Sequence, residues 1–204
     1  PFGLGQVTGI DSTGEQRGIL PNTEWKRSAL GEAWFPGETI SAGIGQGYML
    51  ATPLQLAQAT MVIANRGNSF VPSVVKRVGE LVVGGAKRQS LSVADEHWQA
   101  ILTGMIDVVH SPRGTARSIA RGIDYQIAGK TGTSQVISIA QDAIYDENVI
   151  SERNRNHGLF VAFAPAESPN IVVAVIAENG GGSSAAYPIA RRIIDSWLMG
   201  GRDV

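Results

Sequence analysis

Two near-continuous apolar runs, residues 159–164 and 171–177, constrain the fold of this chain more than any other feature. The segment between them, 165–170, contains Pro, Ser and Asn, which is typical of a turn between antiparallel strands. Because neither run alternates apolar with polar residues, both faces of this hairpin have to be covered. The sequence therefore predicts an antiparallel hairpin with helices on both faces.

Helical periodicity supplies the covering layers. Residues 52–64 open with Thr52-Pro53-Leu54-Gln55, a capping box with proline at the first helical position, and a stop signal follows at Asn65-Arg66-Gly67. A second helix is expected from Ser92, as N-cap, to the break at residues 111–114. Its apolar stripe comprises Trp98, Ile101, Leu102, Met105, Ile106 and Val109. A C-terminal helix around Pro188 should bury Ile189, Ile193, Ile194, Trp197 and Leu198.

Short strands are expected at residues 70–78 and 81–83, and a helical turn at 115–121. A further strand around residues 125–136 precedes the hairpin and completes a three-stranded meander. The fold class is therefore α+β, an antiparallel sheet with helices packed on both faces. Residues 1–51 are rich in glycine and weakly periodic, so they are predicted to form ordered loops around a site. Residues 138–157 are polar and predict a solvated loop, which includes Asp142, Asp146 and Glu147.

Composition excludes several classes of function. With 17 basic and 18 acidic residues the net charge is -1, which argues against nucleic acid as a partner. The chain has no cysteine, so disulfides and thiolate chemistry are excluded. The histidines His97, His110 and His157 are scattered and predict no metal site, and no cofactor is expected. The glycine cluster at 43–47 lacks nucleotide-loop spacing. No run approaches the ~18 apolar residues of a membrane span.

Lys130-Thr131-Gly132, within the strand predicted at 125–136, is the strongest candidate for chemistry. An ammonium beside a nucleophilic hydroxyl favours its alkoxide and assists proton transfer. Threonine hydroxyls hydrogen-bond a substrate carboxylate, and glycine allows a substrate backbone to approach the strand. A backbone N–H at the fourth position, Thr133, is placed to donate to a developing oxyanion.

The wider sequence resembles the penicillin-binding protein transpeptidase family, for which K-T-G is one of three signature elements. Segments that match in order are Gly43–Tyr48, Thr52–Ala57, Ala64–Gly67, Val71-Pro72, Gly114-Thr115-Ala116, Ala128–Thr133, Phe163-Ala164-Pro165 and Ala177–Gly181. The N-terminal stretch, with Trp25 and the run Trp34–Ile40, is similar to the class B elongation-type branch of that family. The resemblance covers nearly the whole chain and implies the penicillin-binding/serine β-lactamase-like fold.

The resemblance also implies an activity. Family members are D,D-transpeptidases in which a serine attacks the D-Ala-D-Ala bond of peptidoglycan stem peptides and forms an acyl-enzyme, and β-lactams acylate the same serine. By this resemblance Lys130, Thr131, Gly132 and Thr133 are catalytic, and Lys130, Thr131, Thr133 and Ser134 bind the substrate or β-lactam. A membrane glycosyltransferase and proteins of the elongation complex are the implied partners. The periplasmic face of the bacterial inner membrane is the implied location.

One departure from the family pattern is important. The family orders its elements S-x-x-K, S-x-N, then K-T-G. Ser73-Val74-Val75-Lys76 formally matches the first, but Pro72 and the paired valines favour a strand over the head of a helix. Ser168-Pro169-Asn170 follows K-T-G and lies in a turn. We expect the nucleophile, the S-x-N element, a pedestal domain and a membrane anchor to precede residue 1, so that residues 1–204 form the C-terminal portion of one transpeptidase domain.

Two alternatives share the fold. One is a non-catalytic sensor that binds penicillin or peptidoglycan without turnover, and an upstream sequence without S-x-x-K would favour it. The other is a β-lactamase, against which the long glycine-rich region and the tryptophan motifs argue.

Overall fold

The computed structural model describes residues 2–83, 85–88, 90–137, 146 and 150–200, which fall into two compact units. Residues 1–59 and 69–89 form the first, here called the N-terminal unit, and residues 60–68 and 90–204 form the second, called the sheet unit. Helix α3 (Pro53–Ala64) begins in the first and ends in the second. Each unit is described by itself below.

The N-terminal unit contains two short helices, α1 (Thr23–Leu30) and α2 (Pro36–Gly43), which the prediction of loops over residues 1–51 missed. Helix α1 begins where Asn22 Oδ1 accepts the Trp25 N–H at 2.8 Å, and it ends at Gly31, whose φ is 71°. Helix α2 begins with Pro36, and Glu38 accepts the Phe35 N–H at 2.7 Å. Helices this short are defined by their caps, and periodicity does not reveal them.

A buried lysine joins α1 to α2. The Lys26 side chain is only 2% exposed, and its Nζ lies 2.6 Å from Glu38 Oε1 and 3.3 Å from Glu32 Oε2. The Phe35 ring centroid is 4.6 Å from the same nitrogen, a cation–π distance. Hydrogen bonding between the two groups raises the pKa of Lys26 and lowers that of Glu38, so the pair is charged at neutral pH.

The predicted capping box of α3 is confirmed. Thr52 donates its backbone N–H to Gln55 Oε1 at 2.9 Å, and Gln55 N–H donates to Thr52 Oγ1 at 3.1 Å. The predicted stop is confirmed too, because Arg66 and Gly67 have φ of 49° and 91°. The strands expected at 70–78 and 81–83 are much shorter: β1 (Arg77–Val78) pairs with β2 (Leu81–Val82), and Phe70 forms only an isolated bridge with Lys87.

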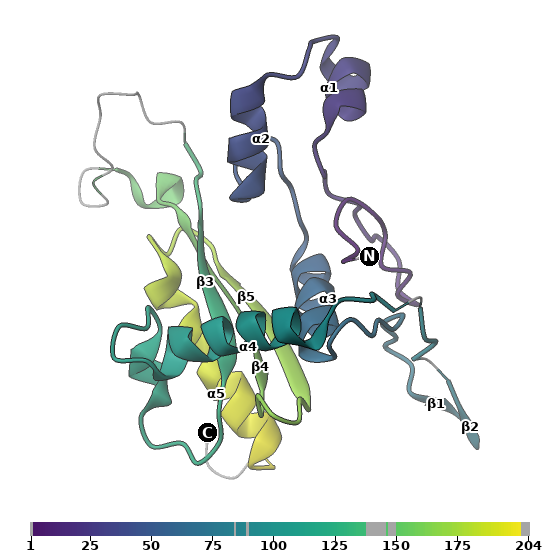
Figure 1. The fold of residues 1–204 in the computed structure, drawn as a ribbon, viewed down its shortest axis with the longest axis vertical. Coiled ribbons are helices and arrows are strands. Elements are labelled where there is room, and N and C mark those ends of the chain that lie inside the picture. Colours follow the sequence, from purple (N-terminus) through teal and green to yellow (C-terminus); the bar gives the residue numbers. More distant parts are fainter. Residues whose placement is uncertain (1, 84, 89, 138–145, 147–149, 201–204) are drawn as a thin grey trace. The chain divides into compact units, whose positions relative to one another are not determined.

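The sheet unit is built on the predicted meander, which is confirmed. Strands β3 (Ala128–Ser134), β4 (His157–Ala164) and β5 (Ile171–Ala177) are antiparallel and lie in the order β3-β4-β5 (Figure 1). In the register, Ala128 faces Phe163 and Phe160 faces Val175. The order follows directly from two consecutive chain reversals.

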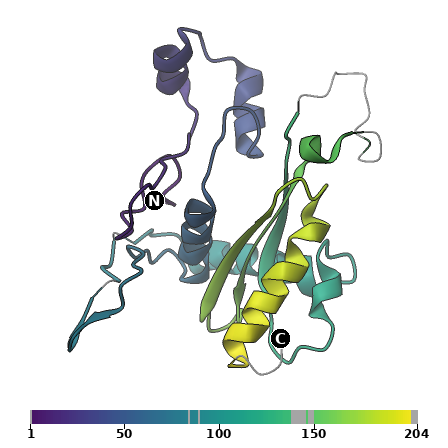
Figure 2. The ribbon, with the colours of Figure 1, turned by 180° about the vertical axis from the view of Figure 1, so that it is seen from behind.

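Helices cover both faces of this sheet, as the apolar strands require. Helix α4 (Asp95–His110) crosses one face in Figure 1, and α5 (Tyr187–Leu198) crosses the other in Figure 2. On the α5 face, Phe160, Ala162 and Ala164 of β4 pack in one cluster with Ala190 and Ile194. On the α4 face, Ala128 and Phe163 pack with Leu102 and Met105. Trp98 is 2% exposed, which confirms its predicted place in the core.

Three short 3-10 turns complete the unit: η1 (Arg117–Ala120), η2 (Glu152–Asn154) and η3 (Ser183–Ala185). The first confirms the helical turn expected at 115–121. The predicted cap at Ser92 is wrong, because α4 begins at Asp95 and its N-cap is Ala94, with no side-chain cap bond. Asp142 and Glu147 lie outside the described residues.

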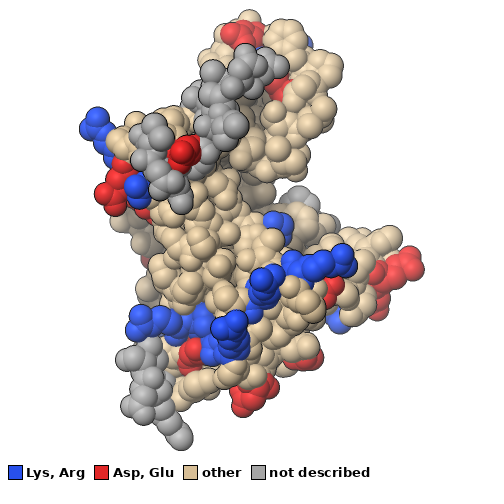
Figure 3. All heavy atoms as spheres, turned by 90° about the vertical axis from the view of Figure 1, so that its left-hand side faces the viewer, with Lys and Arg blue, Asp and Glu red and all other residues tan. Residues whose placement is uncertain are grey.

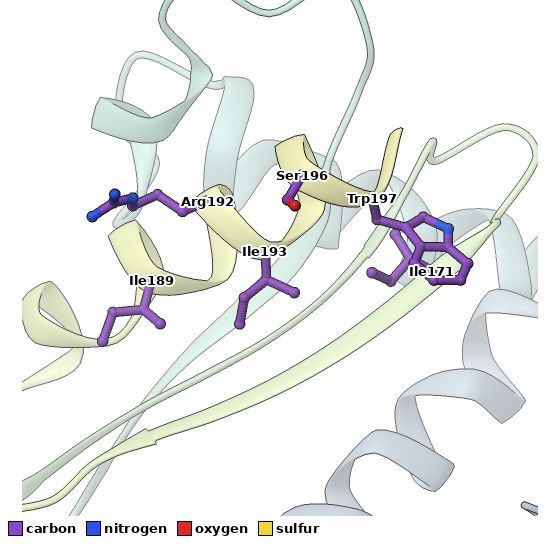
Figure 4. A pocket seen from close by; sticks show the side chains of 6 residues that line it. All are labelled: Ile171, Ile189, Arg192, Ile193, Ser196 and Trp197. Atoms are coloured by element: carbon purple, nitrogen blue, oxygen red, sulfur yellow. The ribbon is translucent and has the colours of Figure 1, made fainter. Parts of the chain in front are cut away.

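The stripe predicted for burial on the C-terminal helix is only partly buried. Ile194 is fully buried, but Ile189, Ile193 and Trp197 are 46%, 43% and 62% exposed. These three residues and Ile171 line an apolar groove of about 550 Å³ beside α5, with Trp197 next to Ile171 of β5 (Figure 4). Trp197 Nε1 donates to Asn170 Oδ1 at 2.6 Å, which fixes the indole at the surface. Helix α5 therefore has apolar residues on more than one side, and the sheet buries only the side that carries Ile194.

The surface carries charges of both signs. Figure 3 shows basic and acidic side chains on the same face, in agreement with the net charge of -1. Within the residues that the structure describes, no helix combines the length and the apolar character needed to cross a membrane.

Candidate active site

The residues predicted to carry chemistry all lie on β3, which pairs with β4 along one side. Lys130 is exposed and Gly132 half-buried, opposite Val161 and Leu159 respectively. Thr131 is half-buried opposite Phe160, and Thr133 is exposed opposite Gly158. Ser134 closes the strand, exposed and opposite His157. A single strand therefore presents the five residues that the sequence singled out.

Strand alternation divides these residues between the two faces of the sheet. Thr131 and Thr133 share a face with Phe160, the face that α5 covers further along β4. Lys130 shares the other face with Val161 and Phe163, toward α4. The two threonine side chains therefore lie on one face of the sheet and the lysine side chain lies on the other.

Lys130 and Thr131 each make a defined contact. Lys130 Nζ donates to the backbone carbonyl of Thr131 at 2.6 Å, so the ammonium is held along its own strand. Thr131 Oγ1 lies 3.0 Å from Thr115 Oγ1, a hydroxyl pair in which either atom is able to donate. The strand thus carries the Lys130 ammonium group and, at Thr131, a hydroxyl within hydrogen-bond distance of a second hydroxyl.

The beginning of β3 is held by two close contacts. Ile127 donates its backbone N–H to His110 Nε2 at 3.0 Å, which ties the strand to the last residue of α4. Burial lowers the pKa of His110, with an opposing effect from the Glu167 carboxylate. At Gly129, a Cβ would lie 2.5 Å from Cζ of the fully buried Phe160, so only glycine fits beneath this ring.

The formal S-x-x-K match lies in the N-terminal unit. Ser73 is in an exposed loop and its hydroxyl is 2.7 Å from Asp11 Oδ2. Asp11 also accepts the backbone N–H groups of Val74 and Val75, at 2.6 and 3.1 Å, and these bonds, with the one from Ser73, lower the Asp11 pKa. Ser73 is therefore not at the head of a helix, the position that the family's nucleophile requires.

Two contacts at the site were not predicted from the sequence. His110, one of three scattered histidines for which no metal site was predicted, ends α4 and also accepts the N–H of Ile127 just before β3. Thr115 was named only as the middle residue of the Gly114-Thr115-Ala116 segment that resembles the family, and no role was predicted for it. The signal for Thr115 was its position in that segment, close before the K-T-G strand and after the end of α4.

Lys-Thr-Gly is one of the signature elements of the serine acyl-transferases that include penicillin-binding proteins. Here it lies on a strand of an antiparallel sheet that has a helix on each face. The family model described as the penicillin binding protein transpeptidase domain matches residues 1–195. The chain therefore belongs to the penicillin-binding protein transpeptidase family.

Individual relatives are similar over nearly the whole chain. The peptidoglycan D,D-transpeptidase MrdA of Acinetobacter baumannii is 46% identical over 208 residues, covering 97% of this chain and 30% of the relative. MrdA of Escherichia coli K12 is 38% identical, covering 98% of this chain and 32% of the relative. This chain thus spans about a third of the length of these relatives.

Solved structures confirm the α+β transpeptidase fold. The crystal structure of Pseudomonas aeruginosa PBP2 in complex with WCK 5153 has a TM-score of 0.83 at 41% identity, covering 97% of this chain and 42% of that one. Helicobacter pylori PBP2, in a complex with MreC, has a TM-score of 0.80 at 28% identity, covering 98% of this chain and 34% of that one.

Proposed function

We propose that this chain is the C-terminal part of the transpeptidase domain of a peptidoglycan D,D-transpeptidase of cell elongation. The observation that carries the proposal is the arrangement of β3, with Thr131 and Thr133 on one face and Lys130 on the other. The 38–46% identity to enzymes named peptidoglycan D,D-transpeptidase MrdA supports the same activity.

In the proposed mechanism the nucleophilic serine and its S-x-N partner come from sequence before residue 1. Lys130 supplies positive potential beside the reacting serine and assists proton transfer. The hydroxyls of Thr131 and Thr133 hold the carboxylate of the terminal D-alanine or of a β-lactam. The Thr133 N–H donates to the oxyanion as the serine adds to the carbonyl.

In each step, the bonds formed and broken and the transferred proton can be stated. The serine oxygen bonds the penultimate D-alanine carbonyl, the terminal D-alanine leaves with the serine's proton, and an acyl-enzyme remains. An amine of a second stem peptide then replaces the serine and forms the cross-link. With a β-lactam, the lactam C–N bond breaks and the ring nitrogen takes the proton, but the leaving group stays tethered.

The proposed location is the periplasmic face of the inner membrane, with a membrane glycosyltransferase and elongation proteins as partners. The complex of Helicobacter pylori PBP2 with MreC supports a partner of the second kind. A structure described as coordinating polymerization and crosslinking in a peptidoglycan synthase complex, 32% identical with a TM-score of 0.76, supports the first.

The decisive test is the intact mass of the complete protein after incubation with benzylpenicillin. We expect a stable adduct on a peptide that precedes residue 1. Lys130→Ala should reduce the acylation rate by on the order of 10²–10⁴, the usual contribution of acid–base catalysis. The matched controls Ser73→Ala and Lys76→Ala, at the formal S-x-x-K match, should acylate like the unmodified protein.

Three results would contradict the proposal in different ways. An adduct on Ser73 would place the nucleophile inside this chain. The absence of any adduct would favour a sensor without turnover. An adduct that hydrolyses within seconds would favour a β-lactamase.

A further inference from the structure

The Gly114-Thr115-Ala116 segment brings a second hydroxyl to the K-T-G strand. Thr115 Oγ1 lies 3.0 Å from Thr131 Oγ1, although the two residues are 16 positions apart. Each hydroxyl has one proton and two lone pairs, so one threonine donates to the other. The direction of this bond determines where the remaining proton of the pair points.

The two neighbours of Thr115 are there for packing. Gly114 donates its N–H to Ser111 O at 2.9 Å, and a Cβ at this position would lie 2.4 Å from the carbonyl oxygen of Val108. Ala116 is fully buried and donates its N–H to the same Val108 oxygen at 2.9 Å. Because backbone atoms cannot move aside as a flexible side chain can, position 114 requires glycine. The segment is thereby fixed against the last turns of α4.

Thr115 itself has no such packing role, since its side chain is exposed. The backbone is fixed on both sides of Thr115, and its hydroxyl lies beside that of Thr131. Thr131 in turn shares its face of β3 with Thr133, the pair to which the proposed function assigns the substrate carboxylate. An exposed threonine that lies between two residues constrained by packing, with its hydroxyl next to that of Thr131, points to a role in ligand binding.

We propose that Thr115 is a positioning residue of the transpeptidase site. Its hydroxyl donates to Thr131 Oγ1, which leaves the Thr131 proton free to donate to the carboxylate of the acyl donor. Thr115 does not touch the substrate; it acts by orienting the group that does. This inference rests on the proposed function, because it needs a carboxylate-bearing substrate at Thr131.

The inference predicts a defect that is specific for the carboxylate. In the complete protein, Thr115→Val keeps the shape of the side chain and removes the hydroxyl. We expect the second-order rate constant for acylation by benzylpenicillin to fall roughly five- to tenfold, the effect of one hydrogen bond. The rate constant for benzylpenicillin methyl ester, which lacks the carboxylate, should stay within about twofold, so the preference for acid over ester shrinks.

Three further variants separate positioning from general damage. Thr115→Ser restores the hydroxyl and should recover the acid preference. Thr103→Val, at an exposed threonine of α4, should leave both rate constants unchanged. In a Thr131→Val background, adding Thr115→Val should have little further effect, because the orienting bond has no recipient.

The outcomes distinguish this inference from the function on which it rests. If the unmodified protein is not acylated by benzylpenicillin, the proposed function fails. If it is acylated but Thr115→Val keeps the full acid preference, whether both rates fall together or neither falls, the positioning role is wrong and the function stands. The melting temperature of each variant verifies that every protein compared is folded at the assay temperature.

Discussion

Ile127, the residue before β3, donates its backbone N–H to Nε2 of His110, the last residue of α4, at 3.0 Å. A ring nitrogen accepts a hydrogen bond only in the neutral imidazole, because both nitrogens of the imidazolium carry protons. The start of the strand that carries Lys130 is therefore coupled to the protonation of one histidine. Burial keeps that histidine neutral by lowering its pKa.

This contact predicts a stability loss in mild acid. The pKa of His110 is lower in the folded protein than in the unfolded chain, where it is about 6.5. Its contribution is therefore complete above about pH 6.5 and is lost as the pH falls through the lower folded value. We expect the melting temperature of the complete protein to fall less between pH 7 and pH 5 in His110→Gln, which still offers an acceptor, than in the unmodified protein. Equal slopes would contradict this.

Gly129 should tolerate no larger residue. In Gly129→Ala the new methyl would lie 2.5 Å from Cζ of the buried Phe160. Overpacking of this kind lowers the free energy of unfolding by about 1–3 kcal/mol. Gly104→Ala is the control, since an added Cβ meets nothing within 4 Å and alanine favours a helix by up to about 1 kcal/mol. The melting temperature should fall in Gly129→Ala and rise in Gly104→Ala.

Lys26 should be essential for the local order of α1 and α2. Lys26→Met removes the cation that Glu38 and Glu32 contact at 2.6 and 3.3 Å. We expect faster hydrogen exchange and earlier proteolytic cleavage within residues 22–48 of the complete protein. Arg27→Met, at the next and exposed position of α1, should leave both measurements unchanged. Similar protection in the two variants would show that the buried charge has no structural role.

The Tyr125 hydroxyl should stabilise the sheet unit. It donates to Asp195, whose other oxygen accepts from Arg191 Nε at 2.6 Å, and burial raises the Tyr125 pKa. Tyr125→Phe should lower the free energy of unfolding by about 1.5–3 kcal/mol, the usual contribution of a hydrogen bond to a charged group. In Tyr187→Phe the edge-to-face contact with Phe160 is kept, so a change within about 0.5 kcal/mol is expected. Denaturant midpoints of the complete protein compare the two.

Elements with strong local signals were predictable. The unbroken apolar character of residues 159–164 and 171–177 fixed the hairpin and its two covering layers, and Thr52 and Gln55 revealed their helix by reciprocal capping. The short helices α1 and α2 were not predicted, because eight residues give too little periodicity to distinguish a helix from a loop. Trp197 was placed in the core because a stripe shows that a face is apolar and does not show which neighbour covers it.

The residues of the candidate site could be predicted from the sequence, but the contacts that Thr115 and His110 make next to them could not. Lys130, Thr131, Gly132, Thr133 and Ser134 form a continuous sequence, so finding the motif also found the strand. Thr115 and His110 lie 16 and 17 residues earlier in the sequence than their contact partners, Thr131 and Ile127. His110 ends α4, and Thr115 lies in the turn that packs against it. Contacts of this kind follow from tertiary structure and leave no spacing pattern in the sequence.

Glycines determine the register of β3 and β4. Gly129 fits beneath Phe160, and at Gly158 a Cβ would lie 2.0 Å from the Gly182 carbonyl oxygen. A slip of one residue between the strands would carry a side chain into the first of these spaces, and it would exchange the faces of the lysine and the two threonines. The same small residues that allow close packing therefore also destabilise a misaligned pairing of β3 with β4. A sheet in which the lysine and the threonines have exchanged faces is disfavoured by packing alone.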